Sequence, residues 1–156
     1  MRSLPGSVML PGMARAIGIN HVALEVGDID EALAWYGRFF AFELRGKRRT
    51  MAWIDLGDQF LALSAGRRQG PDDGRHFGLV VDDKEAVRAA LLDAGVTVAA
   101  SGGLRFEDPW GNQVEIVDYR DVQFTKVPAV LHALAPDGLQ KSAEALAEIE
   151  RKGLAG

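Results

Sequence analysis

The chain has 156 residues, 47% hydrophobic and 26% charged, which is typical of one folded domain with a buried core. Its formal net charge of −4 does not favour nucleic-acid binding, and the lack of cysteine excludes disulfides, thiolate nucleophiles and sulfur-ligated metals. No apolar run has the length of a membrane span, so we expect a cytoplasmic protein without a membrane partner.

Residues 1–15 are predicted to form a flexible N-terminal extension. Their apolar side chains are interrupted by Pro5, Gly6, Pro11 and Gly12, so the segment lacks the unbroken apolar stretch of a signal peptide. We expect Met13 to be the biological start.

The next unit, residues 16–65, is predicted to be a strand, a helix and three further strands. Asp28 and Glu31 form a capping box at the helix start, and apolar residues recur on one helix face as far as Phe40. The later strands are predicted at Ala41–Arg45, Arg49–Leu56 and Gln59–Ser64. The basic run from Arg45 to Arg49 then falls in a hairpin turn, where we expect solvated charge.

A glycine-rich, charged linker at 66–75 leads to a second unit of the same kind at 76–121. Asp82 and Glu85 repeat the helix start, and Gly95 ends that helix. The strands that follow are predicted at Val96–Ala100, Leu104–Glu107 and Gln113–Tyr119. The recurring pairs are His21 and His76, Asp28 and Asp82, and Gly57 and Gly111. Their offsets of 55, 54 and 54 residues predict a duplicated fold.

Strand parity separates each histidine from its apolar neighbours. Successive side chains of a strand point to opposite faces, so His21 lies opposite Val22, Leu24 and Val26. His76 is separated in the same way from the apolar residues that follow it. We therefore expect the apolar faces to pack under the helices and both histidines to face a concave pocket.

With these features the sequence resembles the vicinal oxygen chelate superfamily of glyoxalases, bleomycin- and fosfomycin-resistance proteins and type I extradiol dioxygenases. The resemblance covers roughly residues 16–120 and is most specific at 106–115, where Asp-Pro-Trp-Gly-Asn precedes a strand-borne glutamate. It implies an α+β fold. In this fold two βαβββ modules form an open, cup-shaped mixed β-sheet with helices on the outside, here followed by a helical C-terminal tail.

The resemblance also implies a divalent metal ion, either Fe, Mn, Zn, Ni or Co, held by His21, His76 and Glu115. Two imidazoles and one carboxylate that leave coordination positions open suit these metals. The net positive charge of such a site favours a bidentate anionic oxygen ligand. Glu115 is also the residue for which we predict a catalytic role.

At the fourth ligand position the sequence departs from the glyoxalase pattern. By the repeat offset Glu115 corresponds to Leu61, or with one residue of slip to Phe60 or Ala62, and none of these binds a metal. The glyoxalase I branch carries a carboxylate or an amide there, which helps to move a substrate proton. The departure argues against a simple glyoxalase I activity.

Trp53, Gln113 and Tyr119 are the predicted substrate contacts. Gln113 and Tyr119 share the strand face of Glu115, and Trp53 is an aromatic residue that could line the cup. Sheet or core packing is the alternative explanation for the two aromatic side chains.

Residues 122–156 lie beyond the resemblance and are predicted to form a helical C-terminal extension. Pro128–Leu134 is typical of a short helix. A second helix is predicted from an apolar stripe, with Gly153 at its end: Leu139, Ala143, Leu146 and Ile149. We expect the stripe to cover a sheet surface or a partner subunit.

Two functions from different classes stay open. The first is a metal-dependent enzyme acting on a small oxygen-chelating substrate, as a lyase, isomerase, extradiol-type dioxygenase or resistance-type transferase. The alternative is a metal-free binding or sequestration protein of the bleomycin-resistance type. In either case we expect a homodimer, because paired modules expose sheet edges. The cup forms either within one chain or by exchange of modules with a partner.

Overall fold

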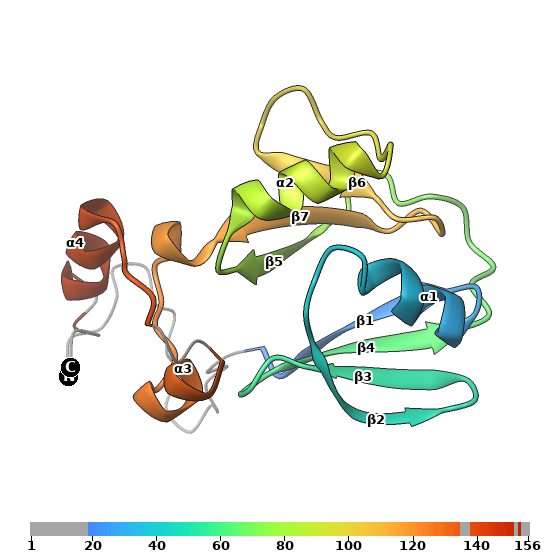
Figure 1. Ribbon diagram of the computed structural model, residues 1–156, viewed down its shortest axis with the longest axis horizontal. Coiled ribbons are helices and arrows are strands. Elements are labelled where there is room, and N and C mark those ends of the chain that lie inside the picture. Colours follow the sequence, from blue (N-terminus) through green and yellow to red (C-terminus); the bar gives the residue numbers. More distant parts are fainter. Residues whose placement is uncertain (1–18, 135–137, 152, 154–156) are drawn as a thin grey trace, which may run out of the picture.

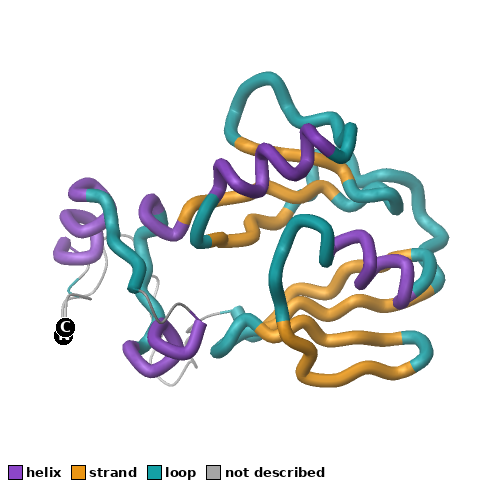
Figure 2. Tube along the Cα trace, in the orientation of Figure 1, coloured by secondary structure: helices purple, strands orange, loops and turns teal. Residues whose placement is uncertain are grey.

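The computed structural model describes residues 19–134, 138–151 and 153, so the predicted extension at 1–15 lies outside the described residues. The strands form two sheets, each accompanied by one helix, and two further helices follow; Figure 1 shows these last helices at one end of the molecule. A loop at the opposite end joins the two sheets (Figure 2). Among the described residues, no helix is long and apolar enough to cross a membrane.

The first module has the predicted succession of strand, helix and three strands. Its elements are β1 (His21–Val26), α1 (Ile29–Tyr36), β2 (Glu43–Arg48), β3 (Met51–Asp55) and β4 (Phe60–Ala65). The strand order is β1-β4-β3-β2, with β1 parallel to β4 and the other neighbours antiparallel. The prediction that the basic run forms the hairpin turn is wrong, because Arg45–Arg48 belongs to β2 and the turn begins at Arg49.

The second module repeats this plan with one strand fewer. Its elements are β5 (Phe77–Val81), α2 (Lys84–Asp93), β6 (Leu104–Glu107) and β7 (Gln113–Asp118), and the strand order is β5-β7-β6. The predicted strand Val96–Ala100 is wrong, since only one bridge forms there, between Val98 and Phe106. The chain turns back into β6 through Gly102 and Gly103, both with positive φ. This short connection limits the pairing between residues 96–100 and β6.

An aspartate caps each of these helices, but only one of the two was predicted correctly. The Asp28 carboxylate accepts a hydrogen bond from the backbone N–H of Glu31 at 3.0 Å, as expected at the start of α1. At the start of α2 the capping residue is Asp83 instead of Asp82, and it accepts from the backbone N–H of Ala86 at 2.9 Å. The repeat offset alone does not distinguish two adjacent aspartates.

Each helix packs on the sheet face opposite the histidine, which confirms that the apolar strand faces lie under the helices; the concave pocket at both histidines stays a prediction. In the first module Leu24, Ile54 and Leu63 are buried with Tyr36 of α1. In the second module the buried residues of β7 alternate in the same way and pack with Leu91 of α2. The sheet face turned away from the helix is called the outer face. The residues of β1, β3 and β7 that point to this face are less buried.

The two cores join at the end of α1. Trp35, Phe40 and Phe77 pack against both, and the Trp35 ring centroid lies 5.8 Å from that of Phe106. The predicted α+β fold of two open modules is therefore confirmed, and the structure adds that the strands form two separate sheets. Because α1 lies at the junction of the modules, the outer faces point away from this shared apolar layer.

The C-terminal tail contacts the end of each module. Helix α3 (Pro128–Leu134) has the predicted bounds and lies against the β3–β4 turn, where a Cβ on Gly57 would come within 2.6 Å of Val130. Helix α4 (Ala143–Arg151) packs on the 3-10 turn η1 (Tyr119–Asp121) that follows β7. The predicted stripe is wrong in part, because α4 buries Ala145 and Ile149 while Leu146 is 53% exposed.

Candidate metal and ligand site

The outer face of the second sheet brings together two of the predicted metal ligands. The Oε2 atom of Glu115, on β7, lies 3.2 Å from Nε2 of His76, which directly precedes β5. Glu115 lies beside Gly78 in the ladder, and the missing side chain leaves space over the strand. Both side chains reach solvent, with 24% of Glu115 and 39% of His76 exposed. One cation could therefore contact an imidazole and a carboxylate here.

Arg105 belongs to the same face and was missed in the sequence. It pairs with Glu115 across the β6–β7 ladder and donates a hydrogen bond from Nη2 to Oε2 of Glu115 at 3.0 Å. Its Nε atom is buried and has no hydrogen-bond partner among the described residues. Strand parity could have found it, because Arg105 points outward between two buried neighbours. Glu115 thus lies between an imidazole and a guanidinium.

His21 lies on the outer face of the first sheet, at the start of β1. Its ring stacks on Phe60 with centroids 4.7 Å apart and an interplanar angle of 8°. Nδ1 of His21 lies 2.8 Å from Oδ1 of Asn20. Because this hydrogen bond occupies Nδ1, Nε2 is the nitrogen left for a ligand.

The three predicted ligands do not form one site within a single chain. In the part of the chain that the structure describes, no three histidine and carboxylate side chains come together as a metal-binding group. His21 therefore stays apart from His76 and Glu115. The metal site made of all three residues remains a prediction.

The ladder registers identify the fourth ligand position. Gly78 and Ala23 each follow the histidine of their module by two residues, and their ladder partners are Glu115 and Ala62. Ala62 is therefore the structural equivalent of Glu115, and its methyl group offers no ligand atom. Leu61, which the repeat offset indicated, is buried in the core on the other face of β4.

Two of the predicted substrate contacts lie on outer faces. The guanidinium of Arg48 is 5.7 Å from the ring centroid of Trp53 on β3. Gln113, on β7, donates from Nε2 to a carboxylate oxygen of Glu107 at 2.7 Å. Both side chains are partly exposed, so their predicted role is compatible with where they lie.

Tyr119, the third predicted contact, lies apart from the face of Glu115. Strand β7 ends at Asp118, and Tyr119 is buried in η1 under the tail. The ammonium nitrogen of Lys141 lies 3.6 Å from the ring centroid of Tyr119 and donates to its backbone oxygen at 2.8 Å. Burial lowers the pKa of Lys141. These contacts hold the tail against the second module, and a substrate role for Tyr119 stays a prediction.

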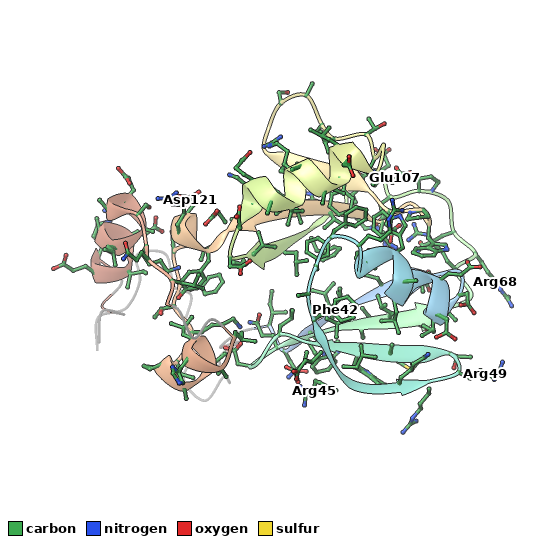
Figure 3. All side chains as sticks on the ribbon, in the orientation of Figure 1. Phe42, Arg45, Arg49, Arg68, Glu107 and Asp121 are labelled. Atoms are coloured by element: carbon green, nitrogen blue, oxygen red, sulfur yellow. The ribbon has the colours of Figure 1, made fainter. Side chains whose placement is uncertain are left out.

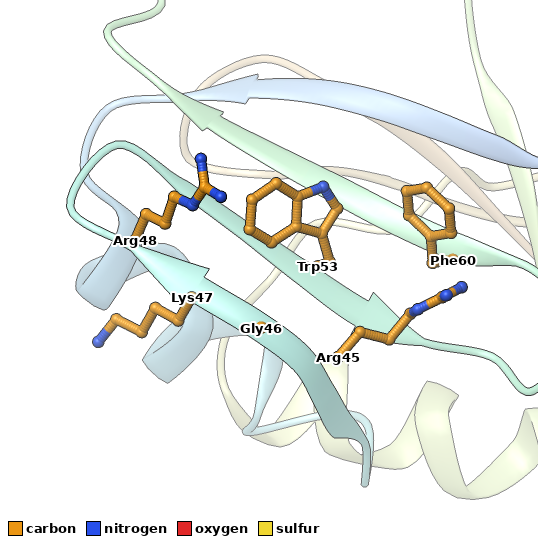
Figure 4. A pocket seen from close by; sticks show the side chains of 6 residues that line it. All are labelled: Arg45, Gly46, Lys47, Arg48, Trp53 and Phe60. Atoms are coloured by element: carbon orange, nitrogen blue, oxygen red, sulfur yellow. The ribbon is translucent and has the colours of Figure 1, made fainter.

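A groove on the outer face of the first sheet contains most of the basic run. Its volume is about 420 Å³, and its lining consists of Arg45, Gly46, Lys47, Arg48, Trp53 and Phe60 (Figure 4). Arg49 lies outside it, at the turn at the far end of β2 from Arg45 (Figure 3). The groove was not predicted, because the basic residues were expected in a turn.

The Asp-Pro-Trp-Gly-Asn motif has a structural role. The buried Asp108 carboxylate accepts hydrogen bonds from the backbone N–H of Asn112 and from the hydroxyl of Tyr36, both at 2.8 Å. The Asn112 amide donates in turn to the backbone oxygen of Glu25 at 3.0 Å. Burial and the adjacent Asp108 charge raise the pKa of the Tyr36 hydroxyl, which keeps it a hydrogen-bond donor. The motif therefore joins the second module to α1 and β1 of the first.

Arg67, which was also missed in the sequence, fixes the linker to this motif. Its side chain is 4% exposed and donates to Asp72 at 3.2 Å, to the backbone oxygen of Gly70 at 2.7 Å and to Asn112. Burial by itself would raise the pKa of Asp72, but hydrogen bonds and charges from Arg67 and Arg75 outweigh it and lower that pKa. The linker is thus held by a buried guanidinium.

Comparison with known proteins agrees with this architecture. Residues 18–116 match a family model described as the Glyoxalase/Bleomycin resistance protein/Dioxygenase superfamily. A possible glyoxalase from Bacillus cereus is 23% identical, with a TM-score of 0.56 over 65% of this chain and 99% of that chain.

Two further solved structures share the fold. Lactoylglutathione lyase from Agrobacterium tumefaciens is 23% identical, with a TM-score of 0.55 over 67% of this chain and 96% of its own. The fosfomycin resistance protein FosX from Listeria monocytogenes is 13% identical, with a TM-score of 0.57 over 67% of this chain and 94% of its own. At such identities the similarity concerns the fold alone.

Proposed function

Because this chain belongs to the glyoxalase/bleomycin resistance protein/dioxygenase superfamily, we propose that it is a metal-dependent enzyme acting on a small substrate with two neighbouring oxygen atoms. The observation that carries the proposal is the 3.2 Å approach of His76 to Glu115. Imidazole and carboxylate are ligands that divalent Fe, Mn, Zn, Ni and Co accept. When bound, such an ion would supply Lewis-acid stabilisation of a substrate oxyanion.

The third ligand, in this proposal, is the His21 side chain of a second copy. Strands β1 and β5 are at the edges of their sheets, so each has one unpaired side among the described strands. Unpaired edges favour the addition of another strand. Docking β1 of one copy beside β5 of the other would bring the partner's His21 towards His76 and Glu115. A homodimer with two equivalent sites follows from this exchange.

The remaining residues of the site favour an anionic substrate. Arg105 orients the Glu115 carboxylate through its 3.0 Å hydrogen bond and adds a positive charge to the same face. An enediolate, a catecholate or a phosphonate has the charge and the oxygen pair that this face would attract. Ala62 occupies the fourth ligand position and has no group that could accept a proton, so no side chain at that position can move a substrate proton.

Mixing two inactive variants tests the shared site. His21→Ala and Glu115→Ala each remove one ligand from every site of their own homodimer. In a refolded equimolar mixture, a mixed dimer regains one intact site, so about one quarter of the wild-type cobalt-binding sites should return. Absorption spectroscopy of bound Co(II) measures the return. No return in the mixture, with both variants folded and dimeric, would contradict the exchanged site.

A metal-free binding protein is the second candidate function. It is favoured by the separation of His21 from His76 and Glu115 within one chain. Metal analysis of protein purified without chelator distinguishes the two candidates, because the enzyme requires a stoichiometric ion that His76→Ala loses. Equal and negligible metal in both proteins would support the binder.

A further inference from the structure

We propose that the groove between Arg45, Arg48, Trp53 and Phe60, called the arginine–aromatic groove, binds an organic anion with a flat apolar body. The ligand class follows from the residues of this chain alone. That the ligand is also the substrate of the metal site rests on the proposed function above.

The two arginines of the groove are free to bind an anion. Neither Arg45 nor Arg48 forms an ion pair with a carboxylate of the described residues, and both side chains are exposed. Lys47, between them, points away from the groove and pairs with Asp30 instead (Figure 4). Guanidinium groups bind carboxylates and phosphonates through two parallel hydrogen bonds, which suits an oxyanion at this place.

Aromatic rings hold these guanidinium groups in position. The guanidinium carbon of Arg45 lies 4.9 Å from the Phe60 ring centroid, and that of Arg48 lies 5.7 Å from the Trp53 centroid. Cation–π contacts of this kind restrict the side chains while their N–H groups stay available. The register shift between Leu44 and Gly46 is a bulge, which re-aims the side chain of Arg45.

The floor of the groove is flat and open because small residues adjoin the rings. Gly46 is the ladder neighbour of Trp53, and a Cβ at Gly46 would lie 3.5 Å from the indole ring. Any larger side chain there would cover the indole. Ala62, on the other side of Trp53, has only a methyl side chain. A planar apolar group can therefore lie on the floor beside Trp53.

The predicted metal ligand of this face lies beside the groove. His21 does not line the groove, but its ring stacks at 4.7 Å on Phe60, which does. A ligand that places its apolar body at Trp53 and its charge at Arg45 therefore has its oxygen atoms at the Phe60 end of the groove, next to His21. Aromatic or conjugated carboxylates have this combination of groups.

Binding of 2-naphthoate to metal-free protein, measured by calorimetry in the presence of EDTA, tests the groove. The uncharged 2-naphthylmethanol and inorganic phosphate are the comparison probes, since each lacks one of the two features. We expect both to bind at least about 10-fold more weakly than 2-naphthoate, because 2-naphthylmethanol lacks the charge-assisted hydrogen bonds to the arginines and phosphate lacks the apolar body that lies beside Trp53. The Trp53 indole N–H signal in NMR spectra should shift with 2-naphthoate and disappear in Trp53→Phe.

Two kinds of variant separate charge from shape. Arg45→Gln and Arg48→Gln should each weaken 2-naphthoate about 10-fold while 2-naphthylmethanol changes little. Gly46→Val should weaken both organic probes, because it covers the indole without changing charge. Arg49→Gln is the matched control: it removes the same charge from the turn outside the groove and should leave binding unchanged.

The outcomes distinguish this inference from the proposed function. If the arginine variants, which lie on an exposed strand, bind 2-naphthoate as the wild type does, the groove is not an anion site. If Arg49→Gln weakens binding as much as Arg45→Gln, general charge attraction explains the binding and the inference fails. If 2-naphthoate binds in the expected pattern but the protein has no affinity for metal, the groove proposal stands and the proposed enzyme function fails. If the protein binds metal but not 2-naphthoate, the groove proposal alone fails.

Discussion

The outer faces of the two modules have one scaffold and different chemistry. In each, the first and last strands pair in parallel, and the residue two places after the histidine pairs with the position that holds Ala62 in the first module and Glu115 in the second. The first face has stacked aromatic rings and two arginines, Arg45 and Arg48, that pair with no carboxylate of the described residues. The second has a carboxylate between His76 and Arg105. In the two proposals above, the duplicated fold divides ligand binding, with one face for the organic body and the other for the cation.

Glu115→Gln should have the largest effect, and it acts on the second face alone. The amide keeps the shape of the side chain but loses the charge that attracts a divalent ion. We expect metal affinity to fall at least about 100-fold, since loss of mere outer partners of a ligand already reduces it 10–100-fold. Calorimetry with Zn(II) measures the affinity. Glu85→Gln, on the exposed side of α2, is the control and should bind metal normally; unchanged affinity in Glu115→Gln would remove the second face from metal binding.

The equivalent glycines Gly57 and Gly111 sharpen the comparison of the modules. Both have φ near +88° (87° and 88°), so alanine is strained at either position. A Cβ at Gly111 would lie 2.6 Å from the backbone of Pro71, whereas at Gly57 it would meet the movable end of Val130. We expect Gly111→Ala to lower the free energy of unfolding by about 2–3 kcal/mol and Gly57→Ala by about 1–2 kcal/mol. Urea unfolding measures both, and a larger loss at Gly57 would contradict this assignment.

The hydroxyl of Tyr36 stabilises the junction between the modules. Tyr36→Phe removes one donor from the buried Asp108 carboxylate, so we expect the free energy of unfolding to fall by about 1.5–3 kcal/mol. Tyr119→Phe is the matched control, because its hydroxyl has a longer, 3.3 Å contact with a neutral hydroxyl. It should lower that free energy by at most about 1 kcal/mol. Equal effects would show that the Asp108 contact is not special.

The ion pairs of Asp72 should have the smallest effect, one that depends on pH. The pKa of Asp72 is lowered from 3.8 in the folded chain, so its charge contributes stability that is present above that value and lost as the pH falls through the folded pKa. Asp72→Asn should therefore be less stable than the wild type at about pH 6, and the difference should shrink at about pH 3. Urea unfolding at both pH values measures it, with the exposed Asp73→Asn as control. A difference that grows on acidification would contradict the assignment.

Sequence patterns predicted what depends on local spacing. The bounds of α3 and β6 and the inward faces of β1 and β7 follow from periodicity along one segment. The predicted cap Asp82 and the predicted strand end Tyr119 are each wrong by one residue, and the prediction for the fourth ligand position left Leu61, Phe60 and Ala62 open. A repeat offset does not resolve differences of one residue. Ladder register decides these positions, and register is a property of the assembled sheet.

The unpredicted parts of the site come from contacts distant in sequence. Arg105 and Arg67 belong to no motif; Arg105 bonds Glu115, 10 residues away, and Arg67 bonds Asn112, 45 residues away. The basic run was placed in a turn because local charge favours solvent there, while cross-strand contacts with Trp53 and Phe60 hold it against a sheet. Cross-strand pairing thus outweighed the local signal at the residues of the proposed anion groove.

The hydrogen bonds of Asp108 have a consequence for mutagenesis of this chain. We expect substitution of Asp108 to cause a loss of function by loosening one half of the molecule from the other, because the carboxylate contacts Tyr36 and Asn112 on both sides of the junction. The signature of that loss is a lower amount of folded protein whose surviving fraction has an unchanged KM and unchanged cation affinity. An inactive Asp108 variant would thus report on how the two halves assemble. A screen for inactive clones alone would mistake Asp108 for a residue that takes part in the reaction.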